Sequence, residues 1–298
     1  MPSLKALRNR IGSVKSTQKI TSAMKMVAAA KLRRAQTQAE AARPYAKRMA
    51  AMMAALVGSA AQNAGTPSLL TGNGKDKVHL LVAVTADRGL AGPFNTNIGR
   101  AVRLKARELE AEGKTVKILA VGRKGNEYFR RELASRLAGN VNFVGKKSVE
   151  FVDAHGIAEK IVQMFRAGEF DVATLVYNSF VSTISQRVTE LPLVPAARPV
   201  ASGDAAPARP APSEAPYEIE PDDGTLLDRL LPRNLAVQLY SALLENAAGF
   251  YASQMMAMDS ATRNAGEMIK KLSLSYNRQR QANITKELIE IISGAEAL

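Results

Sequence analysis

The sequence predicts an α/β protein in which a long antiparallel coiled coil of the N- and C-terminal helices is joined to a Rossmann-like open-sheet α/β domain. Two observations lead to this prediction. Each end of the chain carries an apolar stripe with helical spacing that runs for several times the usual helix length. Between the two ends, apolar runs alternate with helical segments, which is typical of an open, mostly parallel sheet with helices on its faces.

The N-terminal segment 1–57 is predicted to be one helix that begins at the capping residue Ser3. Its apolar seam is expected to start with a/d spacing and to continue after a shift of phase. The residues of this seam are Leu4, Leu7, Ile11 and Val14, followed by Ile20, Met24 and Val27. Pro44 is expected to loosen the helix locally, and the glycines from Gly58 onward predict a loop over 58–77.

The middle segment 78–191 is predicted to fold as one α/β domain. Its first apolar run is nearly continuous, as expected for a strand that is buried on both faces. The predicted strands are 78–85, 116–121, 141–144, 171–177 and an antiparallel strand 183–191, and the predicted helices are about 95–112, 126–137 and 152–166.

The segment 192–221 is rich in Pro, Ala and Ser and lacks apolar periodicity, so a mobile surface loop is predicted there. The segment 222–298 is predicted to form the second long helix. Its stripe contains Met255, Met258, Thr262, Ala265, Met268, Leu272 and Tyr276, followed by Ile284, Leu288, Ile291 and Ala295. Because neither terminal helix can bury its stripe alone, the two are expected to pair with each other; pairing between two copies of the chain is the alternative.

Composition limits the possible functions. The net charge of +14 indicates a solvated basic face, an acidic protein partner or nucleic acid. Aromatic residues make up only 5% of the chain, which argues against single-strand binding by base stacking. The absence of cysteine excludes disulfides, thiolate metal sites and thiol switches. No apolar run is long enough for a membrane span, and the first residues lack the apolar core of a signal peptide.

Glycine-containing turns after the strands raise the question of nucleotide binding. The sequence Gly113-Lys114-Thr115 resembles the end of a phosphate loop, but Glu108 stands where that motif requires glycine. We find no nucleophile elbow, no cluster of metal ligands and no paired carboxylates in a cleft motif, and the two histidines are far apart. A scaffold domain without catalytic residues, cofactor or metal is therefore predicted.

Four segments together resemble one protein family. They are 8–35, 85–95, 177–182 and, with the strongest likeness, 276–298. These segments resemble the γ subunit of F-type ATP synthases of the bacterial type, and the resemblance covers nearly the whole chain apart from the two loops. It implies a non-catalytic rotor subunit rather than an enzyme.

The resemblance also implies how such a subunit works. In this family the two terminal helices form a central stalk inside a ring of three α and three β subunits. The α/β domain forms a foot that is held by the ε subunit and by the membrane ring of c subunits. Proton flow turns the c ring and the stalk, and the stalk drives each catalytic β subunit through its binding states. The implied location is peripheral, on the cytoplasmic side of a bacterial inner membrane.

Contact residues follow from the same resemblance. Contacts with the catalytic ring of α and β subunits are implied for Met24, Lys25, Gln254, Arg280, Gln281, Thr285 and Glu287. Contacts of the foot with the c ring and the ε subunit are implied for Tyr217 and Glu220. Gln254 stands where the family often has arginine, so a weaker contact is expected there. Two alternatives remain: a basic coiled-coil nucleic-acid-binding protein and a nucleotide-binding enzyme.

Overall fold

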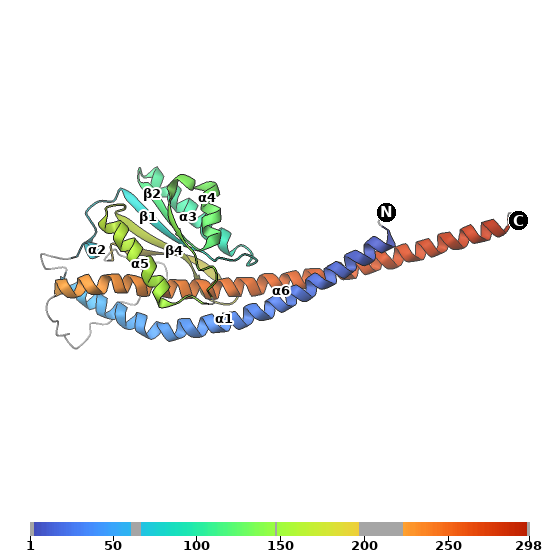
Figure 1. The fold of residues 1–298 in the computed structure, drawn as a ribbon, viewed down its shortest axis with the longest axis horizontal. Helices are drawn as coiled ribbons and strands as arrows, with labels where there is room; N and C mark the ends of the chain where they lie inside the picture. The colour runs from blue at the N-terminus through green and yellow to red at the C-terminus, as the bar shows by residue number, and fades with distance from the viewer. Residues whose placement is uncertain (1–2, 61–66, 147, 197–222, 297–298) are drawn as a thin grey trace. The chain divides into compact units, whose positions relative to one another are not determined.

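The computed structural model describes residues 3–60, 67–146, 148–196 and 223–296 (Figure 1). The chain forms two compact units. The coiled-coil unit comprises Met1–Ala30 and Gln254–Leu298, and the sheet unit comprises Lys31–Ser253. Two long helices, α1 (Leu4–Ala60) and α6 (Asp223–Glu296), contribute to both units. The predicted combination of an α/β domain with long terminal helices that pack together is confirmed.

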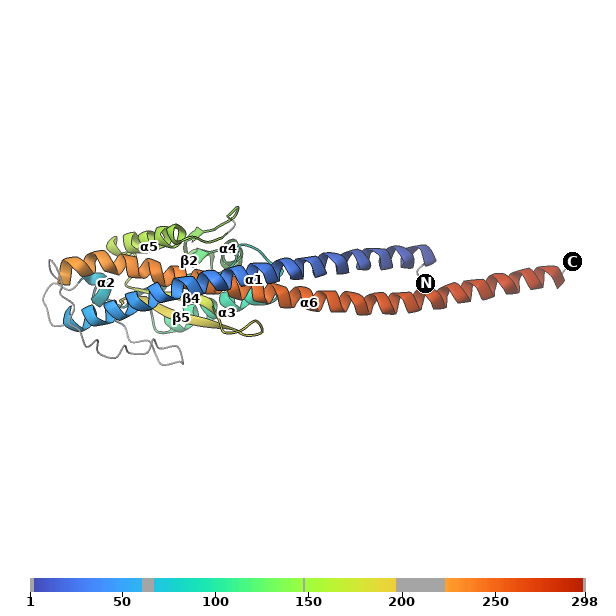
Figure 2. The same ribbon diagram turned by 90° about the horizontal axis from the view of Figure 1, so that it is seen from below.

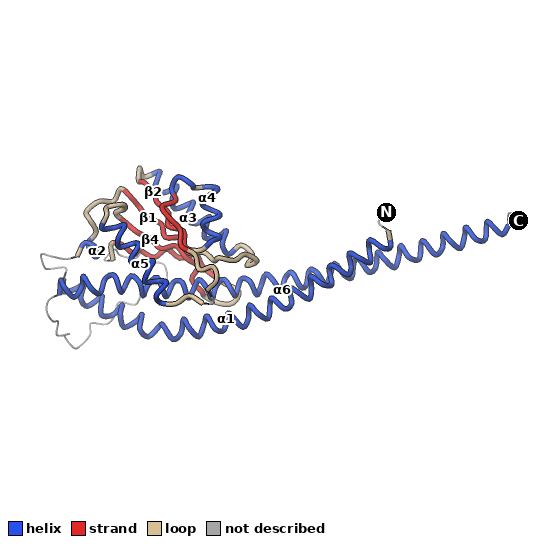
Figure 3. Tube along the Cα trace, in the orientation of Figure 1, coloured by secondary structure: helices blue, strands red, loops and turns tan. Residues whose placement is uncertain are grey.

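The sheet unit contains one five-stranded sheet (Figure 3). Its strands are β1 (Val78–Val84), β2 (Thr115–Val121), β3 (Leu137–Val141), β4 (Val172–Phe180) and β5 (Gln186–Val194). The spatial order is β3-β2-β1-β4-β5, in which the first four strands are parallel and β5 pairs antiparallel with β4. The mostly parallel sheet and its antiparallel last strand agree with the sequence prediction.

Helices cover both faces of the sheet because its central strands are apolar on both sides. On β1, Leu80, Val82 and Val84 face one core and Leu81 and Ala83 face the other. The first core is closed by α5 (Phe151–Arg166) and residues 235–243 of α6, and the second by α3 (Phe94–Ala111) and α4 (Arg123–Glu132). This three-layer arrangement is the usual way to bury a parallel sheet.

The predictions for the region around β3 were wrong. The helix expected at 126–137 is α4, which ends at Glu132, and the strand expected at 141–144 is β3, which ends at Val141. Phe129 and Leu133 are buried four residues apart, so helical periodicity continues past the end of the helix. β3 is a short edge strand that contains Gly139, and its residues have little strand propensity, so the sequence gives no clear signal for it.

The predicted loop 58–77 contains a helical turn. This turn, α2 (Ser68–Thr71), buries Leu70 in an apolar cluster of the sheet unit. The other buried members of the cluster are Met49, Met53 and Leu56 of α1 and Leu227 and Leu231 of α6. β5 also continues to Val194, into the segment predicted as the second loop, and the remainder of that segment from 197 onward lies outside the described residues. Among the described residues, no helix has the length and apolarity needed to cross a membrane.

A buried carboxylate fastens the entry of β1 to the entry of β4. Asp171 accepts hydrogen bonds from the Asn73 side-chain amide (2.6 Å) and from the backbone N–H groups of Lys77 (3.0 Å) and Val78 (2.9 Å). Burial by itself would raise the pKa of the Asp171 carboxyl, but these three hydrogen bonds outweigh burial and leave the pKa below its ordinary value.

We expect Asp171→Ala to lower the free energy of unfolding by about 2–3 kcal/mol at neutral pH, because two partly buried backbone N–H groups and the Asn73 amide lose their charged acceptor. A depressed folded pKa stabilises the fold above the unfolded pKa, near 4, and this contribution is lost as pH falls through the folded value. Urea unfolding at about pH 7 and about pH 3 should therefore show a difference that shrinks on acidification. Asp228→Ala, at an exposed position, is the control. A difference that grows in acid would contradict this account.

Candidate functional site

The place where sheets of this topology bind ligands is filled by the chain itself. The strand order reverses beside β1, and open α/β sheets bind ligands beyond the carboxyl ends of the strands at such a point. There Asn178 donates its side-chain amide to the Phe94 carbonyl (3.3 Å) and its backbone N–H to Asn246 of α6 (3.4 Å). The Phe94 and Phe250 rings meet edge to face at 5.8 Å. Helix α6 therefore packs where a nucleotide would otherwise bind.

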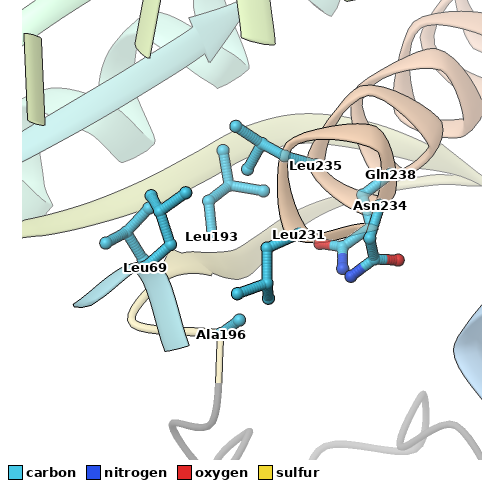
Figure 4. Close-up of a pocket in the computed structure, with 8 residues that line it drawn as sticks. Leu69, Leu193, Ala196, Leu231, Asn234, Leu235 and Gln238 are labelled. Atoms are coloured by element: carbon cyan, nitrogen blue, oxygen red, sulfur yellow. The ribbon is translucent and has the colours of Figure 1, made fainter. Parts of the chain in front are cut away.

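A small depression elsewhere in the sheet unit is mostly apolar. Figure 4 shows the side chains that surround it. They are Leu69, Leu193, Val194, Ala196, Leu231, Asn234, Leu235 and Gln238. Two amides are the only polar side chains among these eight, so the depression offers no acid, base or nucleophile. Among the residues that the structure describes, no His, Asp or Glu cluster could hold a metal ion.

The coiled-coil unit is held together by cross-helix polar contacts. Figure 2 shows α1 and α6 side by side in this unit. Lys25 Nζ lies 2.6 Å from Asp259 Oδ1, and the hydroxyls of Thr21 and Thr262 lie 2.8 Å apart. A Cβ built on Gly266 would lie 3.1 Å from Nε2 of Gln18. The α6 partner moves from 266 to 262 to 259 as the α1 residue moves from 18 to 21 to 25. The two helices of one chain are therefore antiparallel, as predicted.

The α1 seam in this unit differs from the prediction by one position. Ile20 is 60% exposed and Val27 is 55% exposed, so these residues face away from α6. The seam instead contains Gln18, Thr21, Lys25 and Ala28. These positions continue the spacing of Leu4, Leu7, Ile11 and Val14 without any shift of phase. The prediction of a phase shift was wrong because it followed apolarity, whereas the seam keeps its alternation of three and four residues and accepts polar side chains.

The predicted α6 stripe in this unit departs from the structure at one position. Met268 is 45% exposed, whereas the predicted stripe residues Met258 and Ala265 are buried. Thr262 keeps its predicted place in the seam, where it contacts Thr21. Asp259 was missed by the sequence prediction, and the signal that could have found it is an acidic residue within reach of a lysine at an a/d position of the partner helix.

Three of the predicted contact residues lie near the seam. Met24 is half-buried, and Lys25 is 45% exposed while it pairs with Asp259. The hydrogen bond from Lys25, together with the positive charges of Lys25 and Arg263, holds the pKa of Asp259 below its ordinary value. Gln254 is half-buried on α6. Lys25 thus has a partner within its own chain.

The other predicted contact residues lie at the end of α6 or outside the described residues. Arg280, Gln281, Thr285 and Glu287 are all exposed. The structure does not describe Tyr217 and Glu220. From 284 onward every α6 side chain that the structure describes is exposed, including the apolar residues Ile284, Leu288, Ile289, Ile291 and Ile292. This part of the predicted stripe is not covered by α1, and a row of exposed apolar side chains is typical of an interaction surface.

The charged residues of α1 are almost all positive. Lysine and arginine recur from Lys5 to Arg48, whereas Glu40 is the single acidic residue of the helix. The Lys31 ammonium lies 5.6 Å from the centre of the Tyr251 ring in the sheet unit. A helix of this composition favours acidic partners.

Comparison with known proteins decides the family. A protein named ATP synthase gamma chain from Acidiphilium cryptum is 67% identical over the full length of both chains, and one from Granulibacter bethesdensis is 62% identical, also over the full length of both. The family model described as ATP synthase matches residues 3–298. The chain belongs to the ATP synthase gamma-chain family. Members of the gamma-chain family are non-catalytic subunits of the ATP synthase complex, and this chain is one of them.

Solved structures agree with the gamma-chain assignment. The central stalk and c-ring structure of the Tetrahymena thermophila mitochondrial ATP synthase contains a chain that is 28% identical, with a TM-score of 0.60 over 81% of this chain and 99% of that chain. A rotor chain of the Euglena gracilis mitochondrial ATP synthase is 18% identical, with a TM-score of 0.64 over 94% and 98%, and shows the likeness of fold. The nucleic-acid-binding alternative gains no support from these relatives.

Proposed function

We propose that this chain is the central-stalk rotor subunit of a proton-translocating ATP synthase. It couples rotation of the membrane c ring to the conformational cycle of the catalytic β subunits and performs no nucleotide chemistry itself. The observation that carries the proposal is the 67% identity to a gamma chain over the full length of both proteins. The filled switch point of the sheet supports the absence of nucleotide chemistry in this domain.

The uncovered end of α6 supports an enclosing partner. Ile284, Leu288 and Ile291 are 55%, 57% and 70% exposed on a helix that α1 does not cover there. Apolar side chains in such a row are stabilised by removal from water. A ring of three α and three β subunits around this end would cover them, and its apolar lining would let the helix turn without one dominant polar contact.

The proposed contacts with the catalytic ring lie on both terminal helices. On α1 they are Met24 and Lys25. On α6 they are Gln254, Arg280, Gln281, Thr285 and Glu287. Their exposed or half-buried side chains are compatible with such contacts. Because these are interactions between exposed groups, each should contribute modestly and weaken with salt.

The proposed contacts with the membrane side involve Tyr217 and Glu220, which face the c ring and the ε subunit. The proposed location of the chain is peripheral, on the cytoplasmic side of a bacterial inner membrane. The solved relative from Tetrahymena thermophila belongs to a central stalk and c-ring structure, which supports a c ring as a partner.

Reconstitution tests the proposal. The chain is mixed with α and β subunits and MgATP, and steady ATPase activity is expected to appear only when the chain is present. Replacing Arg280 and Gln281 by alanine is expected to lower this activity at least about tenfold at unchanged assembly, equivalent to about 1.4 kcal/mol. The control is Arg107→Ala, which removes another exposed arginine, from α3 of the sheet unit.

Other results would contradict the proposal. If α and β subunits do not assemble with the chain, the rotor function is wrong. If the double variant and the control have equal activity, the contact does not involve Arg280 and Gln281. The same assay applies to Gln254→Arg, which should strengthen a weak contact and change the kinetics. Unchanged kinetics would show that this position makes no contact with the ring.

A further inference from the structure

The coiled-coil unit has an unusual run of polar residues in its seam. Gln18, Thr21 and Lys25 occupy three successive seam positions of α1, where a coiled coil ordinarily places apolar side chains. Thr262 and Asp259 of α6 face Thr21 and Lys25. The contacts are short, with 2.8 Å between the two hydroxyls and 2.6 Å between the charged atoms. Polar residues at seam positions cost stability but can specify the register of two helices.

The apolar residues near the polar contacts specify the register only weakly. Ala28 is 1% exposed and Ala265 is 7% exposed, so small side chains flank the polar contacts, and Met258 (6% exposed) is the larger buried side chain among them. Small residues let two helices approach closely, and a flexible methionine side chain adapts to gaps of different shape, so neither strongly resists a shift by one turn. Such a shift would separate Lys25 from Asp259 and bring the carboxylate beside apolar or uncharged neighbours. Loss of the ion pair therefore penalises every shifted pairing.

We infer that Asp259 and Thr262 of α6, through Lys25 and Thr21 of α1, lock the register of the antiparallel helix pair and thereby position the outward-facing α1 residues Ile20, Met26 and Val27. This inference rests on the proposed function, because the outward face matters only if other subunits surround it. Asp259 and Thr262 are positioning residues: they act through α1 and need touch neither nucleotide nor β subunit. Lys25 then has its own partner within the chain in addition to any contact with the ring.

The register of the helix pair determines the direction in which the outer face of α1 points. A shift by one turn in register rotates the α1 face that meets α6, because the seam repeat and the helix repeat differ slightly. Met26 is 65% exposed next to Val27, so the outer surface carries several apolar side chains whose direction depends on the seam. A register lock keeps this apolar surface at a constant height and direction relative to the α6 end.

Disulfide formation in the full-length chain tests the lock directly, because the natural sequence contains no cysteine. The in-register reporter is Thr21→Cys with Thr262→Cys. Shifted reporters combine Thr21→Cys with Met258→Cys or with Gly266→Cys, one turn to either side. In an otherwise unchanged chain the in-register pair should oxidise rapidly and both shifted pairs slowly.

Charge variants supply the decisive comparison. Lys25→Asp alone and Asp259→Lys alone should slow oxidation of the in-register pair about fivefold, as expected for a partly exposed ion pair, and should speed a shifted pair. The double variant Lys25→Asp with Asp259→Lys should restore the original rate to within about twofold. Single variants that oxidise like the parent, or a double variant no better than the singles, would overturn the inference. If a single variant does not fold, recovery of folding in the double variant supports the lock and its failure to recover overturns it.

A second readout addresses coupling. In membrane vesicles that contain the whole assembled complex, the ratio of protons pumped to ATP hydrolysed should fall in Asp259→Lys, because Asp259 is not among the proposed contacts with the ring and acts only through the register. An unchanged ratio in this variant would overturn the positioning role even if the cross-linking results were as expected. Failure of the parent chain to assemble with α and β would instead count against the proposed function, because the cross-linking arm uses the chain alone.

Discussion

Replacing Gly122 by alanine is expected to lower the free energy of unfolding of the sheet unit by at least about 3 kcal/mol. Gly122 follows β2 with a φ of 99°, a conformation that alanine rarely adopts. A Cβ there would lie 2.5 Å from the Thr85 carbonyl oxygen and 2.6 Å from its hydroxyl. Thr85 cannot move away easily, because its hydroxyl donates to the Val121 carbonyl (3.0 Å) and accepts from the Gly125 N–H (2.9 Å).

Gly113→Ala is the matched control for this prediction. Gly113 has a φ of 78°, but a Cβ there would meet no atom within 4 Å. Its replacement should therefore cost only the left-handed backbone strain of about 1–2 kcal/mol. Urea unfolding of both variants separates the two contributions. Equal losses would show that backbone strain, rather than the collision with Thr85, limits residue 122.

The fold could be predicted from the sequence wherever one local pattern determined the element. The apolar run that begins at Val78 has no alternation, so a strand buried on both faces was readable without the structure. The antiparallel pairing of the chain ends followed from the length of the two stripes. Gly139 and Asn140, in contrast, lie in an edge strand that has neither strong propensity nor strong burial, and no local signal could outweigh the helical periodicity before it.

The candidate site could be predicted only in part, because its contacts join residues far apart in the chain. The exposed positions of Arg280 and Gln281 follow from a helix whose charges face solvent. The pairing of Lys25 with Asp259 depends on the relative register of two helices, and apolarity alone pointed to Ile20 and Val27 instead. A search for apolar stripes does not detect polar seam residues, although these residues keep the alternating three- and four-residue spacing of the seam.

The contact between α6 and the sheet gives the second large expected effect. Phe250→Ala should lower the free energy of unfolding of the sheet unit by about 3–5 kcal/mol, because a buried aromatic side chain is lost and a cavity remains. Phe250 is 6% exposed and packs edge to face against Phe94 (5.8 Å) and Tyr251 (5.4 Å). Gly249 lets α6 come this close, since a Cβ there would already lie 3.2 Å from the Phe94 ring.

Ser253→Ala is the control, because it removes only the hydrogen bond from the Ser253 hydroxyl to Gln186 (2.8 Å) and should cost about 1 kcal/mol. Urea unfolding compares the two variants. In membrane vesicles that contain the whole assembled complex, Phe250→Ala should also lower the ratio of protons pumped to ATP hydrolysed, if the α/β domain transmits torque to α6 through this packing. A variant that loses stability but keeps the parent ratio would show that other contacts, such as that of Asn246 with Asn178, are sufficient to transmit torque. A variant that loses neither would contradict the assignment of Phe250 as the main anchor of α6 on the sheet.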